Sequence, residues 1–183
     1  MQPTDNLKEE HRVIERMIRV INAVSGKLDR GEAIPSEVVE DIVDFIRTFA
    51  DRCHHAKEED LLYARAEARG IPKEGGPIGV MLMEHEQGRD YVRGIVDALP
   101  KYTHGDKNAR TMIARNARAY GSLLSQHIMK EDNILYPMIN DMLTGEDQCE
   151  LMGKFEEVER ERIGEERHHH YIHLVEKLER DYL

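Results

Sequence analysis

The chain has 183 residues, a length that suits one domain, and a formal net charge of −10 with its histidines neutral. A chain this acidic lacks the concentrated lysine and arginine that a phosphate backbone requires, so we expect no nucleic-acid partner. No apolar run approaches eighteen residues, so we expect no membrane span. The N-terminal stretch MQPTDNLKEEH has neither the basic nor the apolar region of a signal peptide, and we expect a cytoplasmic protein.

Apolar residues recur at three- and four-residue steps, which predicts an all-α fold. The predicted helices, in chain order, cover residues 5–28, 36–69, 78–99 and 109–143, the last with a bend at Pro137. Residues 144–183 form a further helical segment, which Thr144 and Asp147 cap and Gly164 divides. Four long helices with short connections predict an up-down-up-down four-helix bundle over residues 5–143. We expect residues 144–183 to be an appended C-terminal extension, so that residues 1–183 form a single domain.

Two segments of the chain repeat one pattern. HHAKEEDLLYA, which begins at His54, aligns with HIMKEDNILYP, which begins at His127. His11 lies 43 residues before His54, His85 lies 42 before His127, and each of these single histidines follows a glutamate. The chain therefore consists of two helix pairs, each with one single histidine followed by one HxxxE motif.

Two adjacent histidines, His54 and His55, each precede a glutamate by four residues. Steps of four from His54 and Glu58 meet Ala50, Ile46 and Leu62, which predicts a buried face. The same walk from His55 meets mostly polar residues, so we expect His55 and Glu59 to form a solvated pair, with a ligand role for them as the alternative. The same test places His11, His85 and His127 on apolar faces.

The buried faces thus hold four histidines and two glutamates, and buried carboxylates are costly unless a cation neutralises them. Six such ligands exceed the four of a structural zinc site. We therefore predict a dinuclear metal site in the bundle core, with both glutamates as bridges and open positions for an oxo or hydroxo bridge and a small ligand. Imidazole and carboxylate ligands suit iron, with manganese or zinc as alternatives. The predicted ligands are His11, His54, Glu58, His85, His127 and Glu131.

Over residues 5–142, these motifs resemble the hemerythrin-like, HHE cation-binding family of non-haem di-iron four-helix bundles. The duplicated HxxKExxxLY is the most specific part of the resemblance. Oxygen-carrying hemerythrins have a second histidine where this chain has Arg89, and a longer last spacing that ends in Asp. The ligand set looks more like that of bacterial proteins implicated in repairing iron centres after nitrosative and oxidative stress, although we do not expect here the cysteine-bearing N-terminal domain that many of those proteins have.

The leading functional hypothesis is a protein with two iron ions that binds or reacts with dioxygen, peroxide or nitric oxide. Tyr120 lies seven residues before His127 and is a candidate hydrogen-bond donor or relay, with packing as its alternative role. The competing hypotheses are a sensor of oxygen or iron, an iron-donating module and a purely structural metal site. Whether the protein is an enzyme stays open.

Other polar residues have less specific roles. In the C-terminal stretch EERHHHYIHL, Glu165, His169 and His173 are spaced for a second metal site, with a solvated helix face as the favoured reading and a cap over the bundle site as another role for His169. We expect His104 to be exposed. Cys53 and Cys149 are expected to be reduced packing residues.

Overall fold

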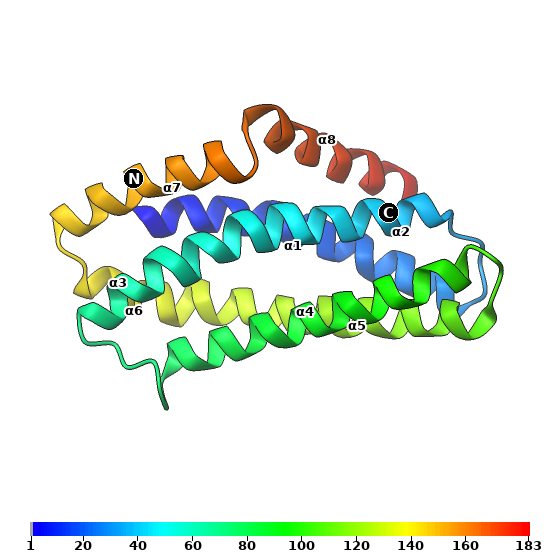
Figure 1. Cartoon of the computed structure of the whole chain (residues 1–183), viewed down its shortest axis with the longest axis horizontal. Helices are drawn as coiled ribbons and strands as arrows, with labels where there is room; N and C mark the ends of the chain where they lie inside the picture. Colours follow the sequence, from blue (N-terminus) through cyan, green and yellow to red (C-terminus); the bar gives the residue numbers. More distant parts are fainter. Residues whose placement is uncertain (1) are drawn as a thin grey trace.

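The computed structural model describes residues 2–183, and this part of the chain is entirely helical apart from short connections (Figure 1). The helical bundle predicted from the sequence is therefore confirmed. The elements, in chain order, are α1 (Pro3–Asp29), α2 (Ser36–Phe45), η1 (Ile46–His55), η2 (Glu58–Leu62), α3 (Tyr63–Ala68), α4 (Pro77–Tyr102), α5 (Lys107–Lys130), η3 (Glu131–Leu135), α6 (Tyr136–Met142), α7 (Gly145–Arg162) and α8 (Glu165–Tyr182). The η elements are π-helical, with backbone hydrogen bonds one residue longer than in an α-helix.

The eleven elements make four long rods and two extra helices. The second rod runs without a break from α2 through η1 and η2 to α3, and the fourth from α5 through η3 to α6. α1 and α4 complete the bundle, in which α5 packs against both of them. Pro137 lies in the first turn of α6, directly after the π-helical η3, where its missing N–H removes one α-helical hydrogen bond. α4 continues past the predicted end and includes Pro100 in its last turn.

Local signals explain where the helices begin and end. At Thr144 the hydroxyl accepts from the Asp147 N–H (3.2 Å) while the Asp147 carboxylate accepts from the Thr144 N–H (2.9 Å), which is the capping box expected there. Gly164 has φ +75°, a left-handed conformation that favours glycine, and it separates α7 from α8 as predicted.

Two apolar clusters fill the bundle, and a layer of buried polar side chains separates them. The larger cluster contains Phe45, Phe49 and Ile113, and the smaller contains Tyr63, Ile78 and Tyr136. The polar layer consists of Glu10, His11, His54, His55, Lys57, Glu58, His85, His127 and Glu131, each less than a tenth exposed. Such a layer is stable only if its charges are compensated within the protein or by a ligand.

The helices α7 and α8 lie lengthwise along one flank of the bundle (Figure 1). They pack against α1 and η1. Tyr171 of α8 is fully buried, packs edge-on against Phe45, and donates a hydrogen bond to Asp44 (2.7 Å). The extension is therefore part of the hydrophobic core and not a loosely attached tail. Within residues 2–183, no helix has the length and apolar character needed to cross a membrane.

Candidate metal centre

The six residues predicted as ligands all lie in the polar layer, and none is more than 2% exposed. Each of the four rods contributes. His11 comes from α1, His85 from α4 and His127 from α5. His54 lies in the last turn of η1, while Glu58 and Glu131 are the first residues of the π-helical segments η2 and η3. Their role as ligands stays a prediction, but the fold brings all six together.

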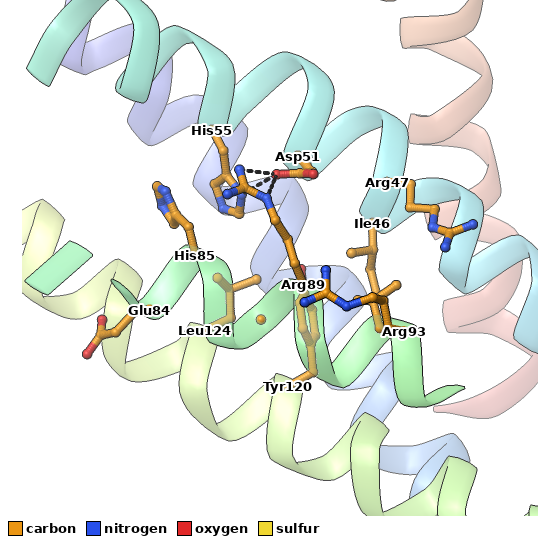
Figure 2. A pocket seen from close by; sticks show the side chains of 12 residues that line it. Ile46, Arg47, Asp51, His55, Glu84, His85, Arg89, Arg93, Tyr120 and Leu124 are labelled. Atoms are coloured by element: carbon orange, nitrogen blue, oxygen red, sulfur yellow. Dashed lines mark hydrogen bonds and ion pairs between the residues drawn. The ribbon is translucent and has the colours of Figure 1, made fainter. Parts of the chain in front are cut away.

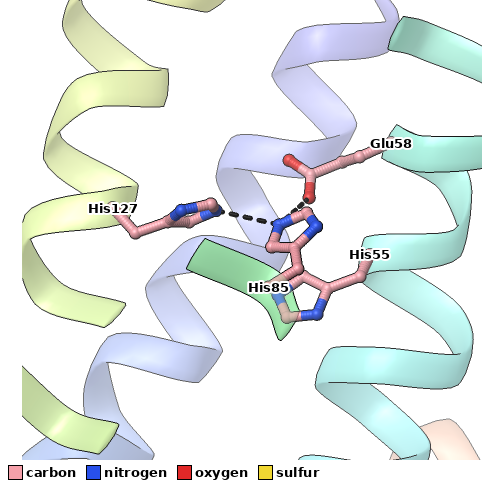
Figure 3. Close-up of side chains that lie close together, drawn as sticks. All are labelled: His55, Glu58, His85 and His127. Carbon is pink, nitrogen blue, oxygen red and sulfur yellow. Dashed lines mark hydrogen bonds and ion pairs between the residues drawn. The ribbon is translucent and has the colours of Figure 1, made fainter. Parts of the chain in front are cut away.

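The ligand atoms gather in two groups that share Glu58. One group contains His11, His54, Glu58 and Glu131. The other contains His55, Glu58, His85 and His127 (Figure 3). Within each group the nitrogen and oxygen atoms lie within 4.8 Å of one another, as atoms around a single cation would. One carboxylate common to two such groups is the arrangement expected of a bridging ligand.

The expectation that His55 faces solvent is wrong. His55 is only 5% exposed, and its ring stacks on that of His85 with 3.9 Å between the ring centroids. Steps of four residues assume a regular α-helix, whereas Ile46–His55 is π-helical. Because the hydrogen bonds of a π-helix span one residue more than those of an α-helix, each turn is wider and the inward face shifts, so that His54 and His55 are both buried in the bundle. Glu59 does not pair with His55 either. It is half-buried and accepts a hydrogen bond from His85.

Every histidine of the two groups is held by a carboxylate at its Nδ1 atom. The distances are 2.7 Å for His11–Asp132, 2.9 Å for His54–Glu10, 3.2 Å for His55–Asp51, 2.7 Å for His85–Glu59 and 2.9 Å for His127–Glu84. A Nδ1–H that donates to a carboxylate leaves Nε2 to face the centre and makes it more basic. These carboxylates are therefore the supports that histidine ligands of a metal require.

The supporting carboxylates are themselves neutralised by basic side chains. Lys57, fully buried, donates to Glu10 (2.6 Å), and Lys130 donates to Glu84. Arg12 pairs with Asp132. Arg89 binds both Asp51 (2.7 Å) and Glu59 (2.8 Å), the carboxylates that hold His55 and His85. Arg89 stands where oxygen-carrying hemerythrins have a second histidine. In this chain its guanidinium holds the two carboxylates that orient His55 and His85, and Figure 2 shows it on Asp51 beside His55.

The tyrosines of the repeated motif bind the two glutamates that are predicted as ligands. Tyr63 donates a hydrogen bond to Glu131, and Tyr136 donates to Glu58, so each half of the chain supports the glutamate of the other half. Burial, together with the nearby glutamate charges, raises the pKa of both phenols well above their usual range. Both tyrosines therefore stay protonated donors.

The other oxygen of each glutamate shows that the cluster suits a cation. Within residues 2–183, Glu58 Oε2 and Glu131 Oε2 are buried and have no hydrogen-bond partner. Imidazole Nε2 atoms lie near them, with His85 3.4 Å from Glu58 and His11 3.2 Å from Glu131. The Nε2 atoms of His85 and His127 lie 3.0 Å apart and point toward each other. Buried anionic oxygens and converging imidazole nitrogens are the donor set that iron, manganese or zinc binds.

The pKa values of the histidines reflect competition between burial and the glutamates. Burial opposes protonation of His11, but Asp132 and Glu131 outweigh it and raise its pKa to about 9. For His127 burial is likewise outweighed, by Glu131 and Glu84, and its pKa rises to about 10. Burial, with the neighbouring His85, lowers the pKa of His55 to about 3, and burial lowers that of His54 well below its usual range. Burial is outweighed at His85 too, by Glu58 and Glu59, and its pKa is raised. Protons on His11, His85 and His127 thus offset the negative charge of the two glutamates, in the positions that a cation would neutralise.

The remaining candidates lie outside the two groups. Among residues 2–183, neither His169 nor His173 belongs to a possible metal-binding group, and both are exposed, as is His104. His169 therefore does not cap the site. Cys53 is buried as expected, but Cys149 is exposed on the outer face of α7, so its prediction as a packing residue is wrong.

The five supporting carboxylates were missed by the sequence analysis as a group, although part of the signal was present. Glu10 and Glu84 each precede a predicted ligand, and the repeat pairs them. Asp132 and Glu59 each follow a predicted ligand glutamate. Asp51 had no such signal, because it takes part only through His55.

Comparisons with known proteins agree with this geometry. The sequence profile described as "Hemerythrin HHE cation binding domain" matches residues 2–139, which is most of the chain. The chain therefore belongs to the hemerythrin HHE cation-binding family, and the resemblance seen in the sequence is confirmed.

Relatives among curated proteins add little about activity. One uncharacterised protein of Mycobacterium tuberculosis and one of Mycobacterium bovis are each 24% identical over 161 residues, which cover 88% of this chain and 62% of each relative. The chain thus spans about three fifths of the length of these relatives. No solved structure matches it significantly.

Proposed function

We propose that the protein is a cytoplasmic di-iron protein that binds or reacts with a small oxidant, namely dioxygen, peroxide or nitric oxide, in oxidative or nitrosative stress or in iron handling. The observation that supports this most is the sharing of Glu58 between two groups of ligand atoms. One group has two histidines and Glu131, while the other has three histidines. Two ions held by one shared carboxylate would therefore have unequal surroundings.

The two groups of side chains would each hold one ion. His11, His54 and Glu131 would hold one ion and His55, His85 and His127 the other, with Glu58 between them. A pair of iron ions there would supply electrons, together with coordination positions open to a small ligand.

The protein keeps the two groups ordered and dry. The carboxylates at Nδ1 fix the tautomer and direction of every imidazole. Tyr63 and Tyr136 hold the glutamate oxygens and keep their own protons. The apolar clusters on either side of the polar layer exclude bulk water, which strengthens these electrostatic interactions.

Peroxide consumption by the iron-loaded protein tests the proposal. We expect repeated turnover, or rapid oxidation of the ferrous form, and the loss of both in Glu58→Gln, because this change removes the carboxylate common to the two groups. His173→Gln, an exposed change on α8, is the control. Iron-loaded protein that reacts with none of the three oxidants faster than free ferrous ion does would contradict the proposal.

A second candidate, a sensor of oxygen or iron, is favoured by contacts that link the site to the extension. His54 donates to Glu10, Glu10 accepts from Lys57, and Lys57 also lies 3.4 Å from Glu159 of α7. Any movement of His54 would reach α7 through two ion pairs. Hydrogen exchange of α7 that differs between oxidised and reduced protein would favour the sensor, and identical exchange would count against it.

A further inference from the structure

Exposed apolar side chains gather on one flank of the bundle. Among residues 2–183, eight large apolar side chains are exposed, and six of them lie in the first two turns of α4 or near the end of the rod that α5, η3 and α6 form. The six are Val80, Met83, Met129, Ile134, Met138 and Met142, each 41–64% exposed. We call the surface that they share the α4–α6 face.

These six side chains lie at the same end of the bundle. The short connection over residues 103–106 makes α4 and α5 antiparallel, and Lys130 on α5 donates to Glu84 on α4. Val80 lies one turn before Glu84, and Ile134 lies one turn after Lys130, so both lie on the same side of this ion pair. Apolar side chains of this number and exposure form a patch on the order of 500 Å², a size that marks interaction sites on monomers.

The equivalent surface in the first half of the chain is covered by α7, which packs against α1, η1 and η2. Lys57 lies 5.7 Å from the centre of the Phe155 ring of α7. Arg65 and Arg69 both bind Asp147 of α7. In Figure 1, α7 and α8 run along the upper edge of the molecule and α4 along the lower edge. The α4–α6 face therefore lies on the flank away from α7.

The repeat shows how the two surfaces differ. When the two HxxKE motifs are aligned, Met138 stands at the position of Arg65. In the same alignment Met142 stands at the position of Arg69. The positions that bind α7 through charges in one half are thus apolar in the other. The α7 of a second copy does not fit the α4–α6 face, because Asp147, which is 2% exposed, would become a buried carboxylate without its arginines.

A second copy that docks by the same face has the matching chemistry. Glu84 and Lys130 neutralise each other within the groove, so two such faces can pack together without leaving this pair's charges uncompensated. A symmetric contact of this kind closes at two copies. A specific dimer buries roughly 800 Å² per partner, and the six apolar side chains supply the greater part of that area.

We propose that the α4–α6 face is the interface of a symmetric dimer, in which the face of one copy packs on the same face of a second copy. The dimer does not depend on the metal and is expected for metal-free and iron-loaded protein alike, so its failure is distinguishable from failure of the proposed function. Lys130 in the groove binds Glu84, and Glu84 binds His127 (2.9 Å), so each copy would contact the side chains that support the other's centre.

Sedimentation velocity of metal-free and iron-loaded protein is the test. We expect the mass to rise from the 21.2 kDa of one chain toward twice that value between about 1 and about 100 µM, the range expected of a modest apolar interface. Added sodium chloride should favour the dimer, because it screens the repulsion between two chains of net charge −10. The mass of one chain at every concentration would overturn the proposal and leave the face to a partner of another sequence.

Matched variants locate the interface. Met138→Arg should weaken the dimer at least roughly tenfold, because each copy then brings an unpaired charge into the contact. It should still fold, since the side chain is exposed and the equivalent position carries Arg65. Met112→Arg adds the same charge at a methionine of similar exposure near the start of α5, outside the α4–α6 face, and should leave the affinity unchanged. Equal affinities for the two variants would overturn the proposal.

Hydrogen exchange of the unaltered protein gives a measurement that needs no variant. Amides of residues 80–83 and 134–142 should exchange more slowly at high protein concentration than at low concentration, because the second copy covers them. Amides of residues 107–112 should exchange at the same rate at both concentrations. Protection of 107–112 in place of the α4–α6 face would show a dimer formed through another surface and would overturn the proposal.

Discussion

The two halves of the bundle, residues 3–68 and 77–142, supply nearly the same parts to the polar layer. His54 with Glu10 and Lys57 corresponds to His127 with Glu84 and Lys130. The halves also hold each other: Tyr63 binds Glu131 and Tyr136 binds Glu58, while His11 binds Asp132 and His85 binds Glu59. Each half is thus incomplete without the other, because the tyrosine and the carboxylate of each repeated motif bind residues of the opposite half.

Three of the differences between the two halves lie on one side of the centre. His55 corresponds to Ile128, Gly88 to Ile14 and Arg89 to Glu15. The first difference adds a third histidine to one group, and the other two place Gly88 and Arg89 in the wall of a pocket beside that group (Figure 2). The repeated residues build a site for cations, and the unrepeated residues make its two sides chemically different.

The largest expected effect concerns the two glutamates, which the repeat treats as equivalent. Glu58 belongs to both groups of ligand atoms and Glu131 to one. Glu58→Gln should therefore lose both ions, while Glu131→Gln should retain part of the metal, as measured by elemental analysis of purified protein. Equal losses would mean that the two glutamates bridge the ions equally.

The paired lysines give the next largest difference. Lys57 is fully buried, whereas the Lys130 side chain is 32% exposed. Lys57→Met leaves Glu10 buried without its partner and should cost roughly 3–5 kcal/mol of unfolding free energy. Lys130→Met should cost about 0–1 kcal/mol, because solvent screens Glu84. Urea unfolding of the two variants measures both values, and equal costs would contradict the difference in burial.

His55 and Ile128 test the asymmetry directly. His55→Ala should lower metal affinity roughly 10–100-fold at the three-histidine group, because it removes one of that group's three imidazoles while Arg89 still holds Asp51. Ile128→Ala removes apolar packing and should lower stability without changing metal stoichiometry. Competition with a chelator measures the affinities. Full metal affinity in His55→Ala would restore the original expectation that His55 is not a ligand.

The pH dependence of the metal-free protein tests the charge balance of the polar layer, to which His11 from one half of the bundle and His127 from the other contribute raised pKa values. His11 and His127 have folded pKa values of about 9 and 10, above the unfolded value of about 6.5. The stability that they contribute is present in full below pH 6.5 and is lost as pH rises through 9 and 10. Each should lower the unfolding free energy by about 1.4 kcal/mol per pH unit within that window.

Urea unfolding between pH 6.5 and 9 measures this slope. Iron-loaded protein is the comparison and should show a flatter profile, since a nitrogen that binds metal holds no proton. A metal-free profile that is flat or rises with pH would contradict the pKa values of these two histidines.

Helical periodicity and the repeat were enough to predict the four rods, the Thr144 and Gly164 boundaries and the convergence of six polar residues. They failed at His55, because a π-helical segment changes which residues face inward and sequence spacing alone does not reveal it. Only some of the carboxylates that support the histidines could be predicted from the sequence. Glu10 and Glu84 are marked by the repeat, but Asp51, Glu59 and Asp132 bind histidines from neighbouring turns or from other helices, which becomes apparent only in the folded bundle.

The central claim is that two iron ions occupy the two groups that share Glu58. Elemental analysis of untagged protein, purified without added metal and then reconstituted with ferrous ion under anaerobic conditions, tests it most directly. We predict close to two irons per chain in wild-type protein and loss of iron in Glu58→Gln. One zinc or no metal per chain, unchanged after reconstitution, would contradict the account and leave a bundle whose polar layer has only a structural role.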